Sequence, residues 1–469
     1  MTADWNRRSP DEHDRIQGLV LQRWLPAAVS FSDYWSMRAR ELGLQVEDLR
    51  TLDDLRRFTP VRERDVSWAG GEGAPALLMR PTEDQVKARA STSLLMRTSG
   101  AIRRDPAGGK RQVMLEEYKP IHLHRGGADD DMAIAYSRSD LDRLHRCGAR
   151  AASVLGLDDA DYLVSAVPSG PRLAWWGVYH FALGASMLGL HPRGHADELE
   201  RCVGAFGLVP ATVVAVELDE AAALAAAIAD RGVAVPRVRT VLTVGPPPDD
   251  DLRAGIRDAW LAAGAADDVV IRALFAPAEA RALWAEDRED PDGLVTYPDL
   301  EILEVVDPIT GQATDGPGDL TVTSLGWHGT ALLRFQTGTY VGGIDGAHDG
   351  KGSAARIAGA VVPRAWQLPF ATPDLGMRHL DLRAAGAVLF SAPNVHAWRV
   401  EIRGGTTKIN HDRFFVEVGG ALDANAEEHL IERLAFATGI TPTQVKGVAD
   451  PVLVEQKVTQ HGSPFADLR

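Results

Sequence analysis

The chain has 469 residues, of which 45% are hydrophobic and 25% are charged, and its formal net charge at pH 7 is −15. This composition is ordinary for a globular protein of roughly two or three domains, and the acidic balance argues against nucleic acid or an anionic membrane as the main partner. The 2 cysteines are too few for a disulfide framework or a cysteine-bound zinc site.

The first part of the chain, residues 10–66, is predicted to be helical. Between residues 30 and 44 the apolar side chains recur about every 3.6 positions, and the pattern stops at Gly43. Another helix is expected within residues 49–65, with Thr51 or Asp53 as its N-cap.

From Tyr136 onward the sequence alternates between helix and strand patterns. Strands separated by helices of about 10–15 residues indicate a parallel α/β sheet. From Gly293 the pattern changes to antiparallel strands. The predicted helices cover residues 136–155 (capped by Ser137 or Ser139), 179–189, 220–231 and 252–263, and the predicted strands cover residues 162–167, 212–216, 238–244 and 269–275.

A boundary between two domains is predicted in the Gly-, Ala- and Pro-containing segment 356–364. The sequence that follows this segment predicts strands at 396–403 and 413–418 and a helix at 426–437. We therefore expect a large domain over residues 1–358 and a small, mobile α+β domain over residues 359–469.

The most informative motif follows a predicted strand at residues 320–324. After a short turn, a second predicted strand ends in Arg334-Phe-Gln-Thr-Gly-Thr339. This arrangement resembles the R-Y-R-T-G-D element of AMP-forming adenylating enzymes, most closely those of the phenylacetate–CoA ligase branch. In that family the final Asp holds the ribose hydroxyls of ATP, and here Thr339 takes its place. The resemblance implies that Arg334 and Thr339 bind the nucleotide.

The resemblance extends from about Ser30 to Arg469. Residues 49–65 resemble the entry segment of the ligases, and the end, Pro464-Phe-Ala-Asp-Leu-Arg469, resembles their R-V-I-D-L-R terminus. The resemblance implies an α/β fold with a large, multi-subdomain adenylation domain and a small α+β C-terminal domain.

The family's phosphate loop, S-S-G-T-T-G-x-P, resembles residues 98–106. Thr98, Ser99 and Gly100 match it, which implies that they bind ATP, whereas Ala101 and Ile102 replace the next hydroxyl residues. Two interpretations remain open. The segment is either a solvated surface loop or an electrostatic phosphate clamp that uses the nearby cations Arg103, Arg104, Lys110 and Arg111.

The family's Y-G-S-T-E element resembles Phe275-Ala-Pro-Ala-Glu279. The resemblance implies that Phe275 lies against adenine and that Glu279 helps to hold Mg²⁺. Alternatively, Glu279 is an acid at the N-terminus of a following helix. The indoles of Trp175 and Trp176 either fill the acyl pocket or pack in the core.

The catalytic lysine of the family lies shortly before its final D-L-R. His461 stands at that place and Lys457 four residues earlier, so the resemblance implies that one of them supplies the positive charge. A further group, His122, His124 and Asp129–Asp131, is interpreted as a solvated loop rather than a metal site.

These motifs imply an ATP- and Mg²⁺-dependent enzyme that activates a small carboxylic acid as its adenylate. The acyl group then passes to the thiol of coenzyme A or of a carrier protein. The altered motifs leave a second interpretation open, a catalytically eroded homologue that acts as a binding or regulatory subunit, and a third, an acyl-transfer subunit. We expect a cytoplasmic protein, because the sequence has no signal-peptide pattern and no apolar run of about 18 residues.

Overall fold

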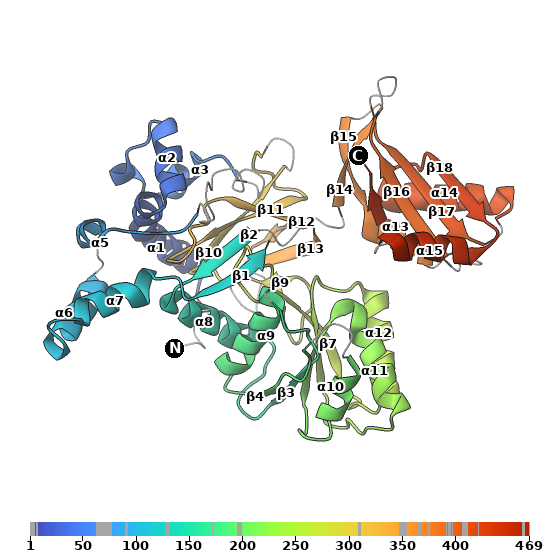
Figure 1. Ribbon diagram of the computed structural model, residues 1–469, viewed down its shortest axis with the longest axis horizontal. Coiled ribbons are helices and arrows are strands. Elements are labelled where there is room, and N and C mark those ends of the chain that lie inside the picture. The colour runs from blue at the N-terminus through green and yellow to red at the C-terminus, as the bar shows by residue number, and fades with distance from the viewer. Residues whose placement is uncertain are drawn as a thin grey trace. The chain divides into compact units, whose positions relative to one another are not determined.

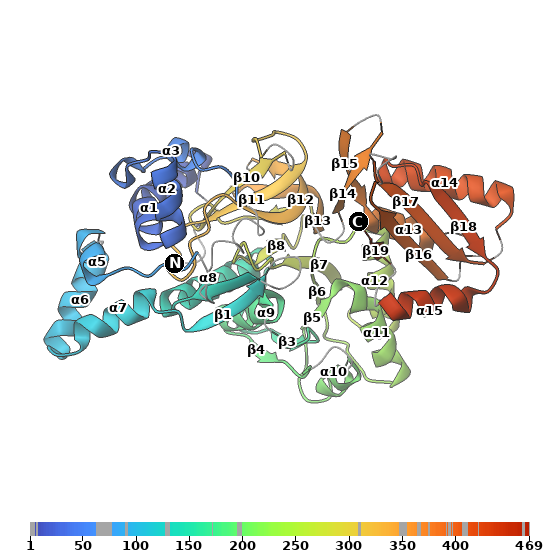
Figure 2. The ribbon, with the colours of Figure 1, turned by 45° about the horizontal axis from the view of Figure 1, so that its top comes forward.

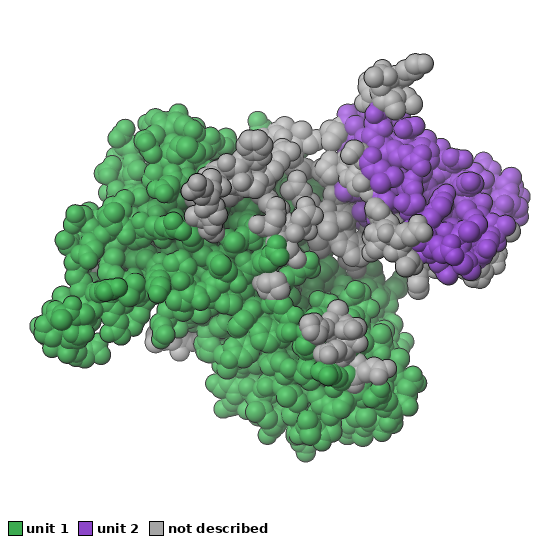
Figure 3. All heavy atoms as spheres, viewed as in Figure 1, with its two compact units in different colours: residues 1–361 green, residues 362–469 purple. Residues whose placement is uncertain are grey.

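The computed structural model is shown in two views (Figure 1 and Figure 2). It describes residues 5, 8–61, 77–89, 92–126, 132–170, 172–194, 199–307, 311–346, 354–363, 367–373, 376–390, 392, 395, 397–405, 411–420, 422–461 and 465–468. The chain forms two compact units, residues 1–361 and residues 362–469 (Figure 3). The predicted boundary falls just before this division, and the segment predicted as the join largely forms a strand, β13 (Arg356–Pro363).

The N-terminal region is helical. Ser9 caps α1 (Pro10–Phe31), and α2 (Asp33–Glu41) follows after a break at Ser32, so the helix predicted over residues 30–44 is two helices. A short 3₁₀ turn (Val46–Asp48) leads to α3 (Leu52–Arg56), whose N-cap is Thr51. The side chains of Thr51 and Asp54 each accept a hydrogen bond from the other's backbone N–H, which forms a capping box and decides between the two predicted caps.

Three further helices, α5 (Glu83–Arg89), α6 (Thr92–Arg104) and α7 (Gly109–Tyr118), come next. In both views α7 follows α6 after a short bend and extends from it at an angle (Figure 1 and Figure 2). The two helices approach closely at Gly109, where a Cβ atom would lie 2.3 Å from the carbonyl oxygen of Ala101. A hairpin of two strands, β1 (His122–Gly126) and β2 (Met132–Tyr136), precedes the main sheet.

The main sheet has 11 strands in the order β10-β11-β12-β13-β9-β8-β7-β6-β5-β3-β4. Its parallel part confirms the predicted α/β sheet. In β5 (Val213–Glu217) alternate residues face different cores. Val214 and Val216 pack with α10 (Leu199–Ala205), α11 (Ala221–Asp230) and α12 (Asp250–Ala262), whereas Val213 and Ala215 belong to the larger core. The parallel strands are β3 (Tyr162–Ser165), β4 (Leu188–Leu190), β5 (Val213–Glu217), β6 (Thr240–Val244) and β7 (Val270–Phe275).

The helices between these strands largely follow the predictions. Ser137 caps α8, as one of the two predicted alternatives. The helix predicted at 179–189 has the wrong bounds, because α9 starts at Leu173 and ends at Gly184, Ser186 adopts a positive φ of 58°, and β4 follows. The helices are α8 (Arg138–Val154), α9 (Leu173–Gly184), α10 (Leu199–Ala205), α11 (Ala221–Asp230) and α12 (Asp250–Ala262).

The remaining strands of the main sheet pair in antiparallel fashion, as predicted from Gly293 onward. The strand predicted to end at residues 334–339 instead begins there and continues to Asp345. The strands are β8 (Trp284–Glu286), β9 (Leu294–Val295), β10 (Glu301–Val306), β11 (Gly318–Ser324), β12 (Phe335–Asp345) and β13.

The second unit is a small α+β fold, as predicted. A sheet with the order β18-β17-β16-β19 packs its apolar side chains, such as Val400 and Val416, against Leu434 of α14. Among the described residues, no helix is long and apolar enough to cross a membrane. The elements are β14 (Gln367–Thr372), β15 (Gly376–Asp381), α13 (Leu382–Phe390), β16 (Ala397–Arg403), β17 (Arg413–Gly419), α14 (Ala424–Thr438), β18 (Gln444–Val448), α15 (Pro451–His461) and β19 (Phe465–Asp467).

Candidate active site

The parallel strands end together at one edge of the main sheet. Glu217 ends β5, Gly245 follows β6 and Phe275 ends β7. Ligands of open α/β sheets bind beyond the carboxyl ends of the strands. Phe275 is buried, and its ring lies 6.2 Å from that of Trp284 on β8. The residue predicted to lie against adenine is therefore at the edge where a ligand would bind.

Glu279 lies directly after this strand end and is buried. A Cβ atom on Gly126, at the end of β1, would lie 3.1 Å from Glu279 Oε1 and 3.1 Å from Ala278 Cβ. The hairpin of β1 and β2 therefore packs against the segment that carries Glu279. The alternative interpretation as a helix N-terminal acid is wrong, because a turn at residues 278–281 and then β8 follow.

Histidine and aromatic side chains cluster beside this hairpin. The ring of His122 lies 4.4 Å from that of Trp176 on α9, and the ring of His124 lies 4.5 Å from that of Tyr136 on β2. Burial, and secondarily the charges of His122 and His180, lower the pKa of His124 to about 2. This imidazole is therefore neutral at physiological pH, and neither of its ring nitrogens has a hydrogen-bond partner within the described structure.

The predicted solvated loop at His122 and His124 is thus wrong. Both residues lie on β1, whereas Asp129–Asp131 lie outside the described residues. In the part of the chain that the structure describes, no group of three or more His, Cys, Asp or Glu side chains is placed to hold a metal ion. The apolar side chains of this segment, Ile121 and Leu123, are exposed and His124 is buried, so the hydropathy pattern gave no correct signal for the buried face.

Arg281 is a buried cation that the sequence did not indicate. Its Nη1 donates to the carbonyl of Thr330 at 2.6 Å, and its guanidinium carbon lies 4.8 Å from the ring centre of Trp327. Burial lowers its pKa to about 10, so it stays charged at neutral pH.

Thr98, Ser99 and Gly100 do not form the predicted loop. All three lie within α6, and the Thr98 hydroxyl donates to the carbonyl of Leu94 at 2.8 Å. Backbone N–H groups inside a helix are used by the helix and cannot cradle a phosphate. Lys110, one of the predicted clamp residues, pairs with Glu83.

Arg334 precedes β12 and has a positive φ of 45°. Its Nε lies 2.9 Å from Glu304 Oε2 on β10, and its Nη1 donates to the Phe58 carbonyl at 2.8 Å. The guanidinium thus connects β10 to the segment after α3. Thr339 is buried on β12, and its backbone N–H donates to Thr337 Oγ1 at 3.2 Å.

The two predicted catalytic residues belong to α15 in the second unit. Lys457 is exposed, and its Nζ lies 2.7 and 2.9 Å from the carboxylate oxygens of Glu417 on β17. His461 is the last residue of the helix, and its side chain lies outside the described structure. A catalytic role for Lys457 would require it to leave Glu417.

The paired indoles, for which an acyl pocket and core packing were both left open, are half-buried on α9 and pack against the main core. Trp175 stacks on Tyr179 with the ring centres 5.8 Å apart, and its own ring meets that of Trp176 edge-on at 4.8 Å. The two rings therefore join the histidine cluster of β1 to the exposed face of α9.

No protein-family model matches the sequence, and no curated protein matches it significantly. Among solved structures, the chain is similar to 2-hydroxyisobutyryl-CoA ligase in the postadenylation state with R3-HIB-AMP, at 15% identity and a TM-score of 0.70, covering 98% of this chain and 94% of that one. The same ligase with 2-HIB-AMP and CoA in the thioesterification state matches at 16% identity and a TM-score of 0.60, covering 99% and 92%.

The chain has the fold of this CoA ligase. The predicted fold class, with a large multi-subdomain adenylating-enzyme domain and a smaller C-terminal domain, is therefore confirmed. Placement within the phenylacetate–CoA ligase branch rests on the sequence motifs and stays a prediction.

Proposed function

We propose that the protein activates a small carboxylic acid by AMP formation and transfers the acyl group to the thiol of coenzyme A or of a carrier protein. The observation that carries the proposal is the position of Phe275 and Glu279 at the carboxyl edge of the parallel sheet, beside the Gly126 hairpin. Support also comes from the match in fold over 98% of the chain to a ligase seen with an acyl-adenylate.

In this proposal, Phe275 borders adenine and Thr339 faces the ribose. Mg²⁺ in nucleotide sites is commonly held by one or two carboxylates together with the substrate phosphates, so the single buried carboxylate of Glu279 fits that role. When bound, the ion neutralises charge on the phosphates. Lys457 or His461 would supply a positive charge toward the acyl carboxylate and the α-phosphate.

A second candidate, a catalytically eroded homologue with a binding or regulatory role, is favoured by a different observation. Three groups predicted to contact nucleotide or catalyse are engaged elsewhere: Thr98 in the α6 helix, Arg334 with Glu304, and Lys457 with Glu417. A fold can persist after its chemistry is lost.

Release of pyrophosphate separates the two candidates. The purified chain would be assayed with ATP, Mg²⁺ and a panel of aryl and short-chain acids, next to Glu279→Gln and a matched surface variant, Glu289→Gln. Acid activation predicts acid-dependent release that falls about tenfold or more in Glu279→Gln, because a lost metal contact lowers activity on that scale. Release that is absent with every acid, from a folded protein, supports the eroded homologue instead.

A further inference from the structure

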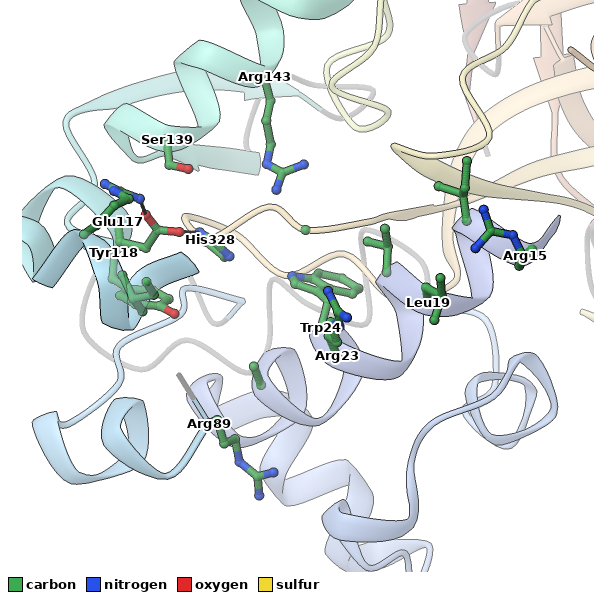
Figure 4. A pocket seen from close by; sticks show the side chains of 16 residues that line it. Arg15, Leu19, Arg23, Trp24, Arg89, Glu117, Tyr118, Ser139, Arg143 and His328 are labelled. Carbon is green, nitrogen blue, oxygen red and sulfur yellow. Dashed lines mark hydrogen bonds and ion pairs between the residues drawn. The ribbon is translucent and has the colours of Figure 1, made fainter. Parts of the chain in front are cut away.

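The first unit contains an arginine-lined cavity that the proposed function does not use. It has a volume of about 520 Å³, and helices α1, α5, α6, α7 and α8 all contribute to its lining (Figure 4). In a chain with a net charge of −15, this gathering of positive charge does not follow from composition. Its charged lining comprises five arginines and one carboxylate: Arg15, Arg23, Arg89, Arg97, Arg143 and Glu117.

Arg143 is half-buried, whereas Arg15 and Arg23 are exposed. A Cβ atom on Gly326 would lie 2.7 Å from Arg143 Nη2, and Gly326 has a φ of +73°, so the glycine leaves room for the guanidinium. Arg143 Nε is shielded from solvent and has no hydrogen-bond partner among the described residues. Burial lowers the pKa of this guanidinium, followed by repulsion from Arg146. A cation removed from water in this way is stabilised when an anion pairs with it.

The single carboxylate of the lining is already neutralised. Glu117 Oε2 lies 2.7 Å from Arg97 Nη1, and Glu117 Oε1 lies 3.0 Å from His328 Nδ1. Figure 4 shows these contacts on one wall, with Arg143 extending from α8 toward the space beside His328. Glu117 therefore leaves most of the positive charge of the cavity uncompensated.

The remaining arginines differ in their partners. Arg89 pairs at 2.9 Å with Glu47, which lies outside the lining. Arg15 and Arg23 lie about two turns apart on the exposed side of α1 and have no ion pair within the described ranges. Arg15 and Arg23 on α1 and Arg143 on α8 therefore line the cavity from two different helices.

We propose that this cavity binds a small polyanion that carries at least two phosphoryl groups, either inorganic diphosphate or an organic phosphate ester. Guanidinium groups present planar pairs of donors that match phosphate oxygens, and the hydroxyls of Tyr118 and Ser139 add donors. The apolar side chains of Leu19 and Trp24 border the same space and offer contact to an organic part. The proposal is independent of acid activation.

Titration calorimetry of the full chain with sodium pyrophosphate, at constant ionic strength, tests it. We expect saturable binding with a stoichiometry of one. Arg143→Gln should raise the Kd about tenfold or more, because it removes charge-assisted hydrogen bonds. The matched control is Arg237→Gln, which removes the same charge from an exposed position outside the cavity lining and should change the Kd less than about twofold.

Absence of saturable binding would overturn the proposal, and so would equal Kd values for the wild type and Arg143→Gln, or equal weakening by both substitutions. If Arg143→Gln does not fold, the exposed Arg23→Gln replaces it, with the same expected direction. Competition by ADP would identify an organic phosphate as a ligand, and its failure would point to inorganic diphosphate. Citrate binding as tight as that of pyrophosphate would overturn the phosphoryl assignment.

Discussion

Replacing Glu301 with glutamine should stabilise the protein at alkaline pH. Glu301 begins β10 and is fully enclosed in the sheet. Trp284 Nε1 and the backbone N–H of Tyr297 each donate to its Oε1 at 2.8 Å. Burial, only partly offset by these two hydrogen bonds, raises the pKa of Glu301 from 4.5 to about 7.

The sign of the effect follows from proton binding. Between pH 4.5 and about 7 the folded protein keeps a proton that the unfolded chain releases, so stability falls as pH rises through this window and stays low above it. Each pH unit within the window corresponds to about 1.4 kcal/mol, which gives a total of about 3 kcal/mol. Glutamine cannot ionise, yet its amide oxygen can still accept from Trp284 and Tyr297.

Urea unfolding of the wild type and Glu301→Gln at pH 5, 6, 7 and 8 measures this difference. We expect similar free energies of unfolding near pH 5 and an advantage of about 3 kcal/mol for the variant at pH 8. Glu289→Gln, at a side chain that is 82% exposed, is the control and should follow the wild type. Parallel pH profiles for the wild type and Glu301→Gln would refute the reasoning. The result bears on the candidate site because Glu301 holds Trp284, whose ring contacts Phe275.

Three other predictions concern the nucleotide, acid stability and catalysis. Thr339→Asp should tighten ATP binding by roughly 1–3 kcal/mol in calorimetry, because a carboxylate accepts stronger hydrogen bonds than a hydroxyl, and an unchanged Kd would argue against nucleotide at this position. Burial opposes ionisation of Glu117, but His328 and Arg97 hold its pKa at about 2, below the ordinary 4.5. The ionised carboxylate therefore adds to the free energy of unfolding above pH 4.5, and this stabilisation is lost as the pH falls toward 2. Glu117→Gln should therefore cost about 2–3 kcal/mol at pH 7, and a pH-independent difference from the wild type in chemical unfolding would count against this. If His461 assists catalysis, pyrophosphate release should become faster in mild acid, at about pH 6.5, and His461→Ala should abolish that pH dependence. Brisk turnover after alanine replaces both His461 and Lys457 would exclude a catalytic role for both residues.

Much of the fold could be predicted because the relevant signals are local. Runs such as Thr240–Val244 are apolar and β-branched and lie between amphipathic helices, a pattern that specifies a parallel sheet. The cap at Thr51 likewise depends on neighbours within three residues. The helix predicted at 179–189 was placed too late in the sequence, since α9 starts at Leu173, and its predicted end was wrong because Ser186 takes a positive φ, which the side-chain pattern does not encode.

The site was only partly predictable because its contacts join distant segments. Thr98, Ser99 and Gly100 match the letters of a phosphate loop, but the surrounding apolar pattern folds them into α6. Arg334 was assigned to the nucleotide from its place in the motif. Its actual partner is Glu304, on another strand, and no local feature of the sequence shows this ion pair. The positions of Phe275 and Glu279 at the end of β7 could be predicted because the strand pattern there is strong, whereas their roles toward nucleotide and metal stay predictions.

Direct detection of an acyl-adenylate tests the central claim most directly. The enzyme at high concentration would be mixed with ATP, Mg²⁺ and each acid of the panel, without a thiol acceptor, and the quenched mixture analysed by mass spectrometry. The account predicts acyl-AMP with at least one acid, reduced in Glu279→Gln and retained in Glu289→Gln. Absence of any acyl-AMP from wild-type protein that is shown to be folded would contradict it.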